Sequence, residues 1–346
     1  MAIIGNSNFS DIFKIEKHKS IVADSFRKNG YVVVSGVLNK EDINPVFNEY
    51  SIVLDQLISG LSRLGKLKKA YDNLLFLDRM SQFISETGSR YHKNFESRFP
   101  YEVLEENTPI HLGPAIFNLM RNKKLNDVIE ILIGPEIRSN PVNTLRIKPP
   151  QQILPEGTIH AGVSETPWHQ DFVNYPSEAK ETQILTVWIA MTDSTEEMGC
   201  LRVIPGSHKA GLDTHCPADD FYKKFNQSVG GGIPEELINE KDAVPVPVNA
   251  GDVIFLHRLT KHASLPNLSN KLRWSFDLRY HPTHQFSGHP LKPSWVTRSK
   301  DNPSTEIKDW KIWAKMWRDA QSQLVKTKQV PIYIQYSPEN PLCAPS

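Results

Sequence analysis

Cysteine is scarce in this chain, which has only Cys200, Cys216 and Cys343 among its 346 residues. Three cysteines spaced so widely are too few for a disulfide framework or a zinc cluster. A reducing interior is therefore the expected setting. Cys343 also begins a final Cys-Ala-Pro-Ser that formally fits a prenylation box, but Pro345 and the lack of a nearby basic cluster argue against lipidation.

The chain also lacks a charge excess and long apolar runs. Its 40 basic and 39 acidic side chains leave a formal net charge of +1, so no overall field attracts it to nucleic acid or to a membrane surface. No run of about 18 apolar residues is present, and the first residues lack the basic region and apolar core of a signal peptide. These absences predict a soluble, intracellular (cytoplasmic) protein that binds neither nucleic acid nor membranes.

The first part of the chain, residues 1–140, is mostly helical by pattern. Apolar spacing and helix-end signals predict one strand over residues 31–38 and helices over residues 9–30, 39–61 and 116–133. Residues 62–101 combine basic with aromatic side chains. They are expected to form an amphipathic helix with a solvated basic face, or a lid whose Arg or Lys receives an anionic substrate.

The texture then changes to short apolar runs separated by Pro, Gly and Asn. Such spacing predicts an antiparallel all-β unit, a sandwich or a jelly roll, over residues 141–285. Residues 209–242 interrupt the pattern and are expected to form an inserted loop near the site. Residues 286–346 contain an irregular stretch, a tryptophan-rich helix over 305–326 and a tail. We expect one catalytic domain over residues 1–346.

A candidate metal site begins where His169 and Asp171 stand two residues apart. In an extended segment such side chains leave the same face, so an imidazole and a carboxylate can occupy two corners of one divalent metal. The segment after Gly251 offers two candidates for a third ligand, His257 and His262. Two histidines and one carboxylate form the facial set of non-haem Fe(II) oxygenases.

Eleven residues after His262 stands Arg273, whose planar guanidinium could hold the far carboxylate of a dicarboxylate cosubstrate. Its segment alternates, with Arg273, Ser275, Asp277 and Arg279 on one face and Leu272, Trp274, Phe276 and Leu278 on the other. A buried polar face needs partners, because unpaired buried charge is very costly. Asp277 and Arg279 could contact a substrate or pair with each other, and we expect the pairing.

In their order and spacing, the motifs of this chain resemble the phytanoyl-CoA dioxygenase family of Fe(II)- and 2-oxoglutarate-dependent oxygenases. The resemblance runs from about residue 133 to residue 280. It rests on Gly134-Pro135, Lys148-Pro149-Pro150, Trp168-His169-Gln170-Asp171, Trp188, Gly199-Cys200-Leu201, Pro205-Gly206-Ser207-His208-Lys209, Gly251-Asp252, His262-Ala263-Ser264 and Arg273. A His-x-Asp motif alone is weak evidence, but the ordered set is highly specific.

The resemblance implies a mainly β fold with flanking helices, whose core is a double-stranded β-helix of the cupin-like jelly-roll type. It implies binding of Fe(II), 2-oxoglutarate and O2. It also implies that His169, Asp171 and His262 are the metal ligands. His262 is preferred over His257 because only His262 is followed by the family's Ala-Ser and stands eleven residues before the arginine.

The same resemblance assigns the cosubstrate. Arg273 would bind the far carboxylate of 2-oxoglutarate. Ser264 and Ser275 are candidate hydroxyl donors to that carboxylate, while Trp188 and Thr144 occupy positions that line the cosubstrate in the family.

The implied activity is oxidation, most simply hydroxylation, of a C–H bond in a small-molecule substrate, with release of succinate and CO2. The same site could instead catalyse desaturation, cyclisation or epoxidation. A third class is a metal-binding jelly roll that is not an oxygenase, an isomerase or a binding module, which would not need Arg273. No separate peptide-docking domain is evident, which favours a small molecule over a protein substrate. Phytanoyl-CoA itself is not implied.

Overall fold

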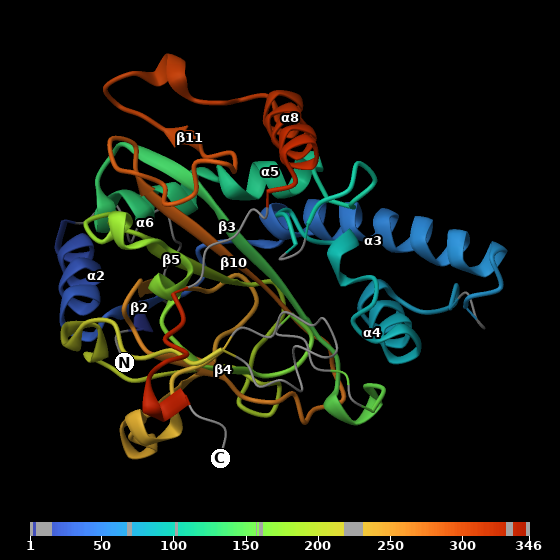
Figure 1. The fold of residues 1–346 in the computed structure, drawn as a ribbon, viewed down its shortest axis with the longest axis horizontal. Helices are drawn as coiled ribbons and strands as arrows, with labels where there is room; N and C mark the ends of the chain where they lie inside the picture. The colour runs from blue at the N-terminus through green and yellow to red at the C-terminus, as the bar shows by residue number, and fades with distance from the viewer. Residues whose placement is uncertain are drawn as a thin grey trace.

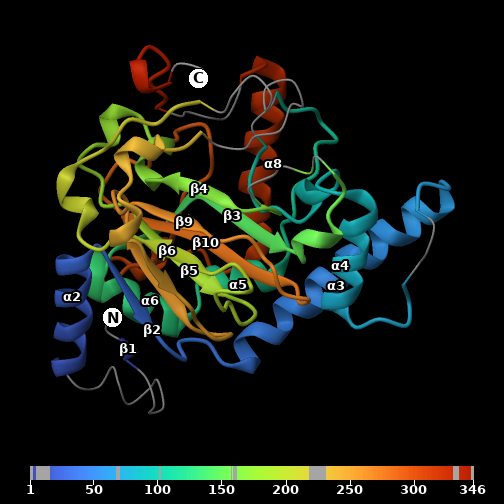
Figure 2. The ribbon, with the colours of Figure 1, turned by 90° about the horizontal axis from the view of Figure 1, so that it is seen from below.

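The core of the protein is a pair of facing β-sheets (Figures 1 and 2). The computed structural model describes residues 3–4, 16–67, 71–100, 103–156, 158, 162–217, 231–329 and 335–343. The larger sheet has the strand order β1-β2-β8-β5-β10-β3-β11, and the smaller has the order β4-β9-β6-β7. The strands are β1 (Ile3–Ile4), β2 (Tyr31–Val34), β3 (Ile137–Lys148), β4 (Thr166–His169), β5 (Leu185–Ala190), β6 (Leu201–Val203), β7 (Val244–Val246), β8 (Val253–His257), β9 (His262–Ser264), β10 (Arg273–Pro282) and β11 (Trp295–Arg298).

The eight strands from β3 to β10 have the topology of a double-stranded β-helix. Strands β3, β5, β8 and β10 belong to the larger sheet, and β4, β6, β7 and β9 belong to the smaller one. An apolar cluster fills part of the space between the sheets, with Trp188 and Ile254 from the larger sheet and Leu201 and Val246 from the smaller. This arrangement confirms the predicted jelly-roll core.

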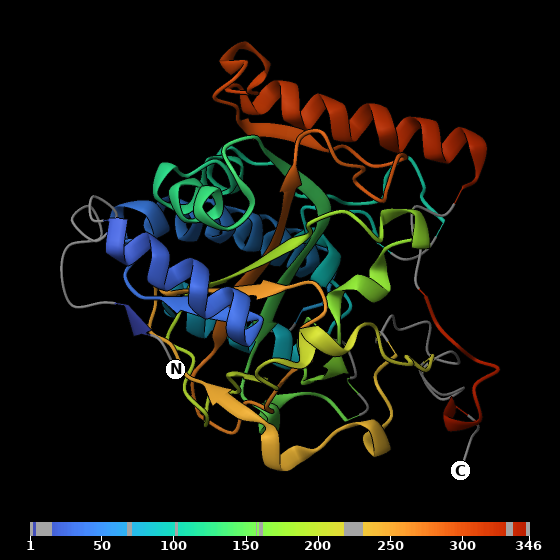
Figure 3. The ribbon, with the colours of Figure 1, turned by 90° about the vertical axis from the view of Figure 1, so that its left-hand side faces the viewer.

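Helices cover the outer face of the larger sheet (Figures 1 and 3). They are α2 (Glu16–Asn29), α3 (Lys40–Arg63), α4 (Phe76–Thr87), α5 (Pro114–Met120), α6 (Lys123–Ile133) and α8 (Trp310–Thr327). Within the described residues, none of them combines the length and apolarity needed to cross a bilayer.

Some predicted boundaries were wrong for local reasons. The helix expected over residues 116–133 is two helices, because the Asn122 side chain accepts hydrogen bonds from the backbone N–H groups of Lys124 (2.9 Å) and Leu125 (3.3 Å) and so starts α6 afresh. The described part of residues 62–101 contains the end of α3, then α4 and a short 3-10 turn, His92–Asn94. The stretch expected to be irregular contains β11, and residues 9–15 of the first expected helix lie outside the described residues.

Strand β10 shows how the sequence positions the interior. Trp274 packs edge-on against Phe47 of α3, with ring centroids 4.9 Å apart, and lies 5.1 Å from the ring of Tyr50. Phe276 and Leu278 join the same core under the helices. Because side chains alternate along a strand, this apolar face fixes the register and turns the polar residues of β10 toward the space between the sheets.

A disulfide joins Cys216 to Cys343. A single bond is not the disulfide framework that was excluded, but this pair was not expected from three widely spaced cysteines. The two cysteines are 127 positions apart in sequence, and only the fold brings them into contact. The C-terminal segment returns to the first part of the insert, where Ser337 N–H donates to the His215 carbonyl (3.0 Å) and the Asn340 side chain donates to the Thr214 hydroxyl (3.0 Å).

We expect peptide mapping under non-reducing conditions to recover Cys216 and Cys343 in one linked peptide. Cys343→Ser should lower the free energy of unfolding by on the order of 2–4 kcal/mol, because the unfolded chain loses a long covalent loop. The difference between variant and wild type should disappear in reductant. Three titratable thiols in the oxidised, denatured wild type would contradict this prediction.

Candidate metal and cosubstrate site

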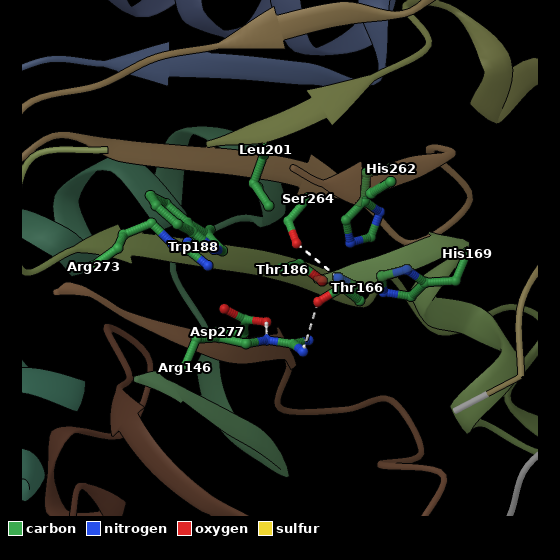
Figure 4. Close-up of a pocket in the computed structure, with 11 residues that line it drawn as sticks. Arg146, Thr166, His169, Thr186, Trp188, Leu201, His262, Ser264, Arg273 and Asp277 are labelled. Carbon is green, nitrogen blue, oxygen red and sulfur yellow. Dashed lines mark hydrogen bonds and ion pairs between the residues drawn. The ribbon is translucent and has the colours of Figure 1, made fainter. Parts of the chain in front are cut away.

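The predicted metal ligands meet between the two sheets. β4 pairs with β9 so that His169 lies opposite His262, and Figure 4 shows the two rings side by side. Asp171 begins the 3-10 turn that follows β4. The His169 Nε2 lies 3.9 Å from Asp171 Oδ1, and the His262 Nε2 lies 4.0 Å from Asp171 Oδ2. One divalent cation can therefore contact all three side chains.

Backbone carbonyls set the orientation of both imidazoles. His169 Nδ1 lies 2.9 Å from the Pro167 carbonyl, and His262 Nδ1 lies 3.0 Å from the Thr260 carbonyl. These contacts place the ring proton on Nδ1 and leave each Nε2 lone pair to a metal. Burial, followed by the proximity of His262, holds the pKa of His169 well below its usual range. The neutral imidazole needed for ligation is thus favoured.

Gln170, between His169 and Asp171, is hydrogen-bonded to neighbouring loops. Its side-chain amide donates to the Gly211 carbonyl (2.7 Å) and the Leu259 carbonyl (2.8 Å), and its backbone N–H donates to His215 Nε2 (3.0 Å). The Trp168 indole donates to Glu240 (2.8 Å). The described ends of the insert therefore lie against the ligand strand, as expected of a loop near the site.

Asp171 is held by two donors from the larger sheet. Arg279 forms an ion pair with Oδ1, and the Thr186 hydroxyl donates to Oδ2. Burial by itself raises the pKa of Asp171, but the charge of Arg279, the two imidazoles and the Thr186 hydrogen bond outweigh it and lower that pKa. The carboxylate stays ionised in a site where it is 1% exposed.

Arg273 is a buried cation that has no acidic partner among the described residues. It is 1% exposed, its Nη1 lies 3.4 Å from the Ser275 hydroxyl, and its guanidinium carbon lies 5.3 Å from the centre of the Trp188 ring. Within the described part of the chain, no carboxylate comes within ion-pair distance of it, and its Nε has no hydrogen-bond partner. Burial lowers the pKa of Arg273 to about 10. An anionic ligand would supply the missing partner.

Lys148 is a candidate that the sequence reasoning missed. It lies directly opposite Arg273 in the β3–β10 pairing, is 1% exposed, and donates to the Ser264 hydroxyl. Burial, and then the charges of Arg273 and Arg146, hold the pKa of Lys148 well below its usual range. Its place in a Lys-Pro-Pro motif was the available signal. Its position opposite Arg273 could be recognised only from the strand pairing.

The expected pairing of Asp277 with Arg279 was wrong. Asp277 Oδ2 accepts from Arg146 Nε at 2.9 Å, and Arg146 Nη1 also contacts the Thr166 hydroxyl at 3.1 Å (Figure 4). Asp277 and Arg146 lie on neighbouring strands, where side chains come closer together than those of Asp277 and Arg279, which are two residues apart on one strand. Asp277 Oδ1 is buried and has no hydrogen-bond partner within the described part of the chain.

One cavity unites most of the predicted residues (Figure 4). It is lined by Arg146, Thr166, His169, Thr186, Trp188, Leu201, His262, Ala263, Ser264, Arg273 and Asp277. Ser275 and Thr144 share the interior face but do not line it, so their cosubstrate contacts stay predictions. His257 lies apart, 5.1 Å from the His208 ring, and burial lowers its pKa to about 4.

The donor set fits Fe(II), since two imidazoles and one carboxylate leave the remaining positions open. The buried Arg273, which lacks an acidic partner among the described residues, fits the far carboxylate of a dianionic cosubstrate. These residues therefore suit both Fe(II) and 2-oxoglutarate, which the family resemblance implied.

Comparisons with known proteins identify the family of this chain. The family model described as Phytanoyl-CoA dioxygenase (PhyH) matches residues 26–275. The 1-deoxypentalenic acid 11-beta-hydroxylase of Streptomyces exfoliatus is 31% identical over 303 residues, covering 85% of this chain and 92% of that protein. Its namesake from Streptomyces arenae is 25% identical over 299 residues, with the same two coverages.

Among solved structures, the apo form of the non-heme monooxygenase ThoJ is similar in fold, with a TM-score of 0.52 and 19% identity over 88% of this chain and 99% of that one. The family match spans well over half of the chain, and His169, Asp171 and His262 form a cluster that could hold a metal ion. The chain belongs to the phytanoyl-CoA dioxygenase family of Fe(II)- and 2-oxoglutarate-dependent oxygenases.

Proposed function

We propose that this enzyme hydroxylates a C–H bond of a small organic molecule and couples this step to the conversion of 2-oxoglutarate to succinate and CO2. One observation carries the proposal. A single cavity holds both the metal-ligand histidines and the buried Arg273, which meets no acidic side chain among the described residues. The relatives named as 1-deoxypentalenic acid 11-beta-hydroxylases support a small-molecule substrate and a hydroxylation outcome.

The far carboxylate of 2-oxoglutarate would pair with Arg273 and Lys148, which face each other across β10 and β3. The hydroxyl groups of Ser264 and Ser275 already contact these two cations and can donate to the same carboxylate. The Trp188 ring lies beside Arg273 and forms part of the cavity wall. The far carboxylate would form charge-assisted hydrogen bonds with both cations and so offset the repulsion between them.

Fe(II), held by His169, Asp171 and His262, would supply the activation of O2, with one oxygen atom passing to succinate and the other to the substrate. The chain itself orients the reactants. The Nδ1 contacts of both imidazoles fix their Nε2 atoms toward one point, and the buried cations align the cosubstrate with that point. The low exposure of Asp171 and His262, 1% and 6%, limits water around the reacting groups.

Asp277 is the side chain that we assign to the substrate. It lines the cavity, is 5% exposed, and presents Oδ1, which has no hydrogen-bond partner in the portion of the chain that the structure describes. A hydroxyl or N–H group of the substrate would satisfy this buried acceptor. Arg279, for which a substrate contact was the alternative to pairing with Asp277, forms an ion pair with Asp171 instead.

The direct test is an anaerobic titration of the protein with Fe(II) and 2-oxoglutarate. We expect a weak visible charge-transfer band that requires both additions and is lost in His169→Ala, because that variant removes one of the three metal ligands. His257→Ala is the matched control and should keep the band, because this histidine lies outside the site. A folded, metal-binding wild type without the band would refute the oxygenase assignment.

The cation pair should control affinity for 2-oxoglutarate but not for Fe(II). Arg273→Ala should raise the Kd for 2-oxoglutarate about 10- to 100-fold, the effect of removing a charge-assisted hydrogen bond from a buried site. Titration of the charge-transfer band would measure it. An unchanged Kd in Arg273→Ala would place the far carboxylate elsewhere.

Lys148 should make this affinity pH-dependent. Burial lowers the pKa of Lys148, so its ammonium loses a proton as pH rises and can then no longer pair with the carboxylate. We expect the wild-type Kd for 2-oxoglutarate to increase with rising pH and Lys148→Met to weaken binding and flatten that dependence. Parallel pH curves for the two proteins would exclude this role.

A further inference from the structure

Arg279 is fixed against a metal ligand by several acceptors. Besides its ion pair with Asp171, its Nη1 donates to the Val142 carbonyl (2.9 Å) and lies 3.4 Å from the Asp277 carbonyl. Its exposure is 3%. Two of the three acceptors are backbone carbonyls of β3 and β10. The larger sheet therefore holds the guanidinium in place independently of the orientation of the Asp171 carboxylate.

Thr186 completes this arrangement from the neighbouring strand. It lies directly opposite Arg279 in the β5–β10 pairing, and its hydroxyl donates to the second oxygen of Asp171. Each carboxylate oxygen therefore receives one donor from the larger sheet. Both imidazoles belong to the smaller sheet, on strands β4 and β9.

We propose that Arg279 and Thr186 are positioning residues of the iron centre, which orient the Asp171 carboxylate toward the metal and balance its charge. This inference rests on the proposed function, because it assigns Asp171 to Fe(II). Two donors, one on each oxygen, oppose rotation of the carboxylate about its Cβ–Cγ bond. They also leave one lone pair on each oxygen for the metal.

Two consequences separate this role from a purely structural ion pair. A carboxylate free to rotate must be ordered again when the metal binds, which weakens Fe(II) binding. A carboxylate without its cation is a stronger donor, which changes the energy of the iron-to-cosubstrate charge-transfer band. A structural pair would alter the stability of the metal-free fold and leave both quantities unchanged.

The experiment compares Arg279→Met, Arg279→Lys, Thr186→Val and Thr186→Ser with wild type by anaerobic Fe(II) titration at saturating 2-oxoglutarate. We expect Arg279→Met to raise the Kd for Fe(II) about 10- to 100-fold and to shift the band. Arg279→Lys and Thr186→Ser should each restore part of the loss. Thr186→Val, which keeps the shape of the side chain, should raise the Kd several-fold and decides the question if Arg279→Met does not fold.

Arg298→Met is the matched control, because Arg298 also pairs with acids, Asp127 and Glu130, but on β11 away from the metal. It should leave the Kd and the band as in wild type. A Kd within twofold of wild type and an unshifted band in folded Arg279→Met, or in Thr186→Val, would overturn the inference. Failure of wild type itself to form the band would instead refute the proposed function.

Discussion

The burial of charge between the two sheets is the constraint on which the site depends. β10 is buried along its whole length, so its polar face carries Arg273, Asp277 and Arg279 into the interior. An isolated buried ion costs several kcal/mol, and each of these side chains must therefore find a partner. Arg279 finds Asp171 and Asp277 finds Arg146. Arg273 meets no acid among the described residues, and the cosubstrate's far carboxylate fits that place.

The proposed metal ligands His169 and His262 reach the site through the pairing of β4 with β9, while the groups that hold Asp171 come from β5 and β10 of the other sheet. A metal bound there joins the two layers of the jelly roll through one carboxylate. Because metal-binding free energy adds to folding free energy when the ligands come together only in the folded state, occupation of this centre should stabilise the contact between the sheets as well as prepare the chemistry.

Short-range patterns were enough to predict much of the site. The two-residue spacing of His169 and Asp171, the fixed distance from His262 to Arg273, and the alternation along β10 are local features. The partners of Asp171 and Asp277 were beyond reach, because they depend on which strands pair and in what register. Arg146 and Asp277 are 131 residues apart in sequence. The Cys216–Cys343 disulfide was missed for the same reason, since only the returning C-terminal segment brings those residues together.

Under the proposed function, the pairing scheme would also favour a dicarboxylate as the cosubstrate. Arg279 with Asp171 and Arg146 with Asp277 cancel in charge, which leaves Arg273 and Lys148 as adjacent cations on opposite strands. A keto acid with one carboxylate could reach the metal but would leave this pair unsatisfied and desolvated, at a cost comparable to breaking a buried ion pair. A dianion of the right length satisfies both ends at once. Discrimination therefore comes from the penalty for leaving buried cations unpaired, as it does wherever a site is built around a polar group that the wrong ligand lacks.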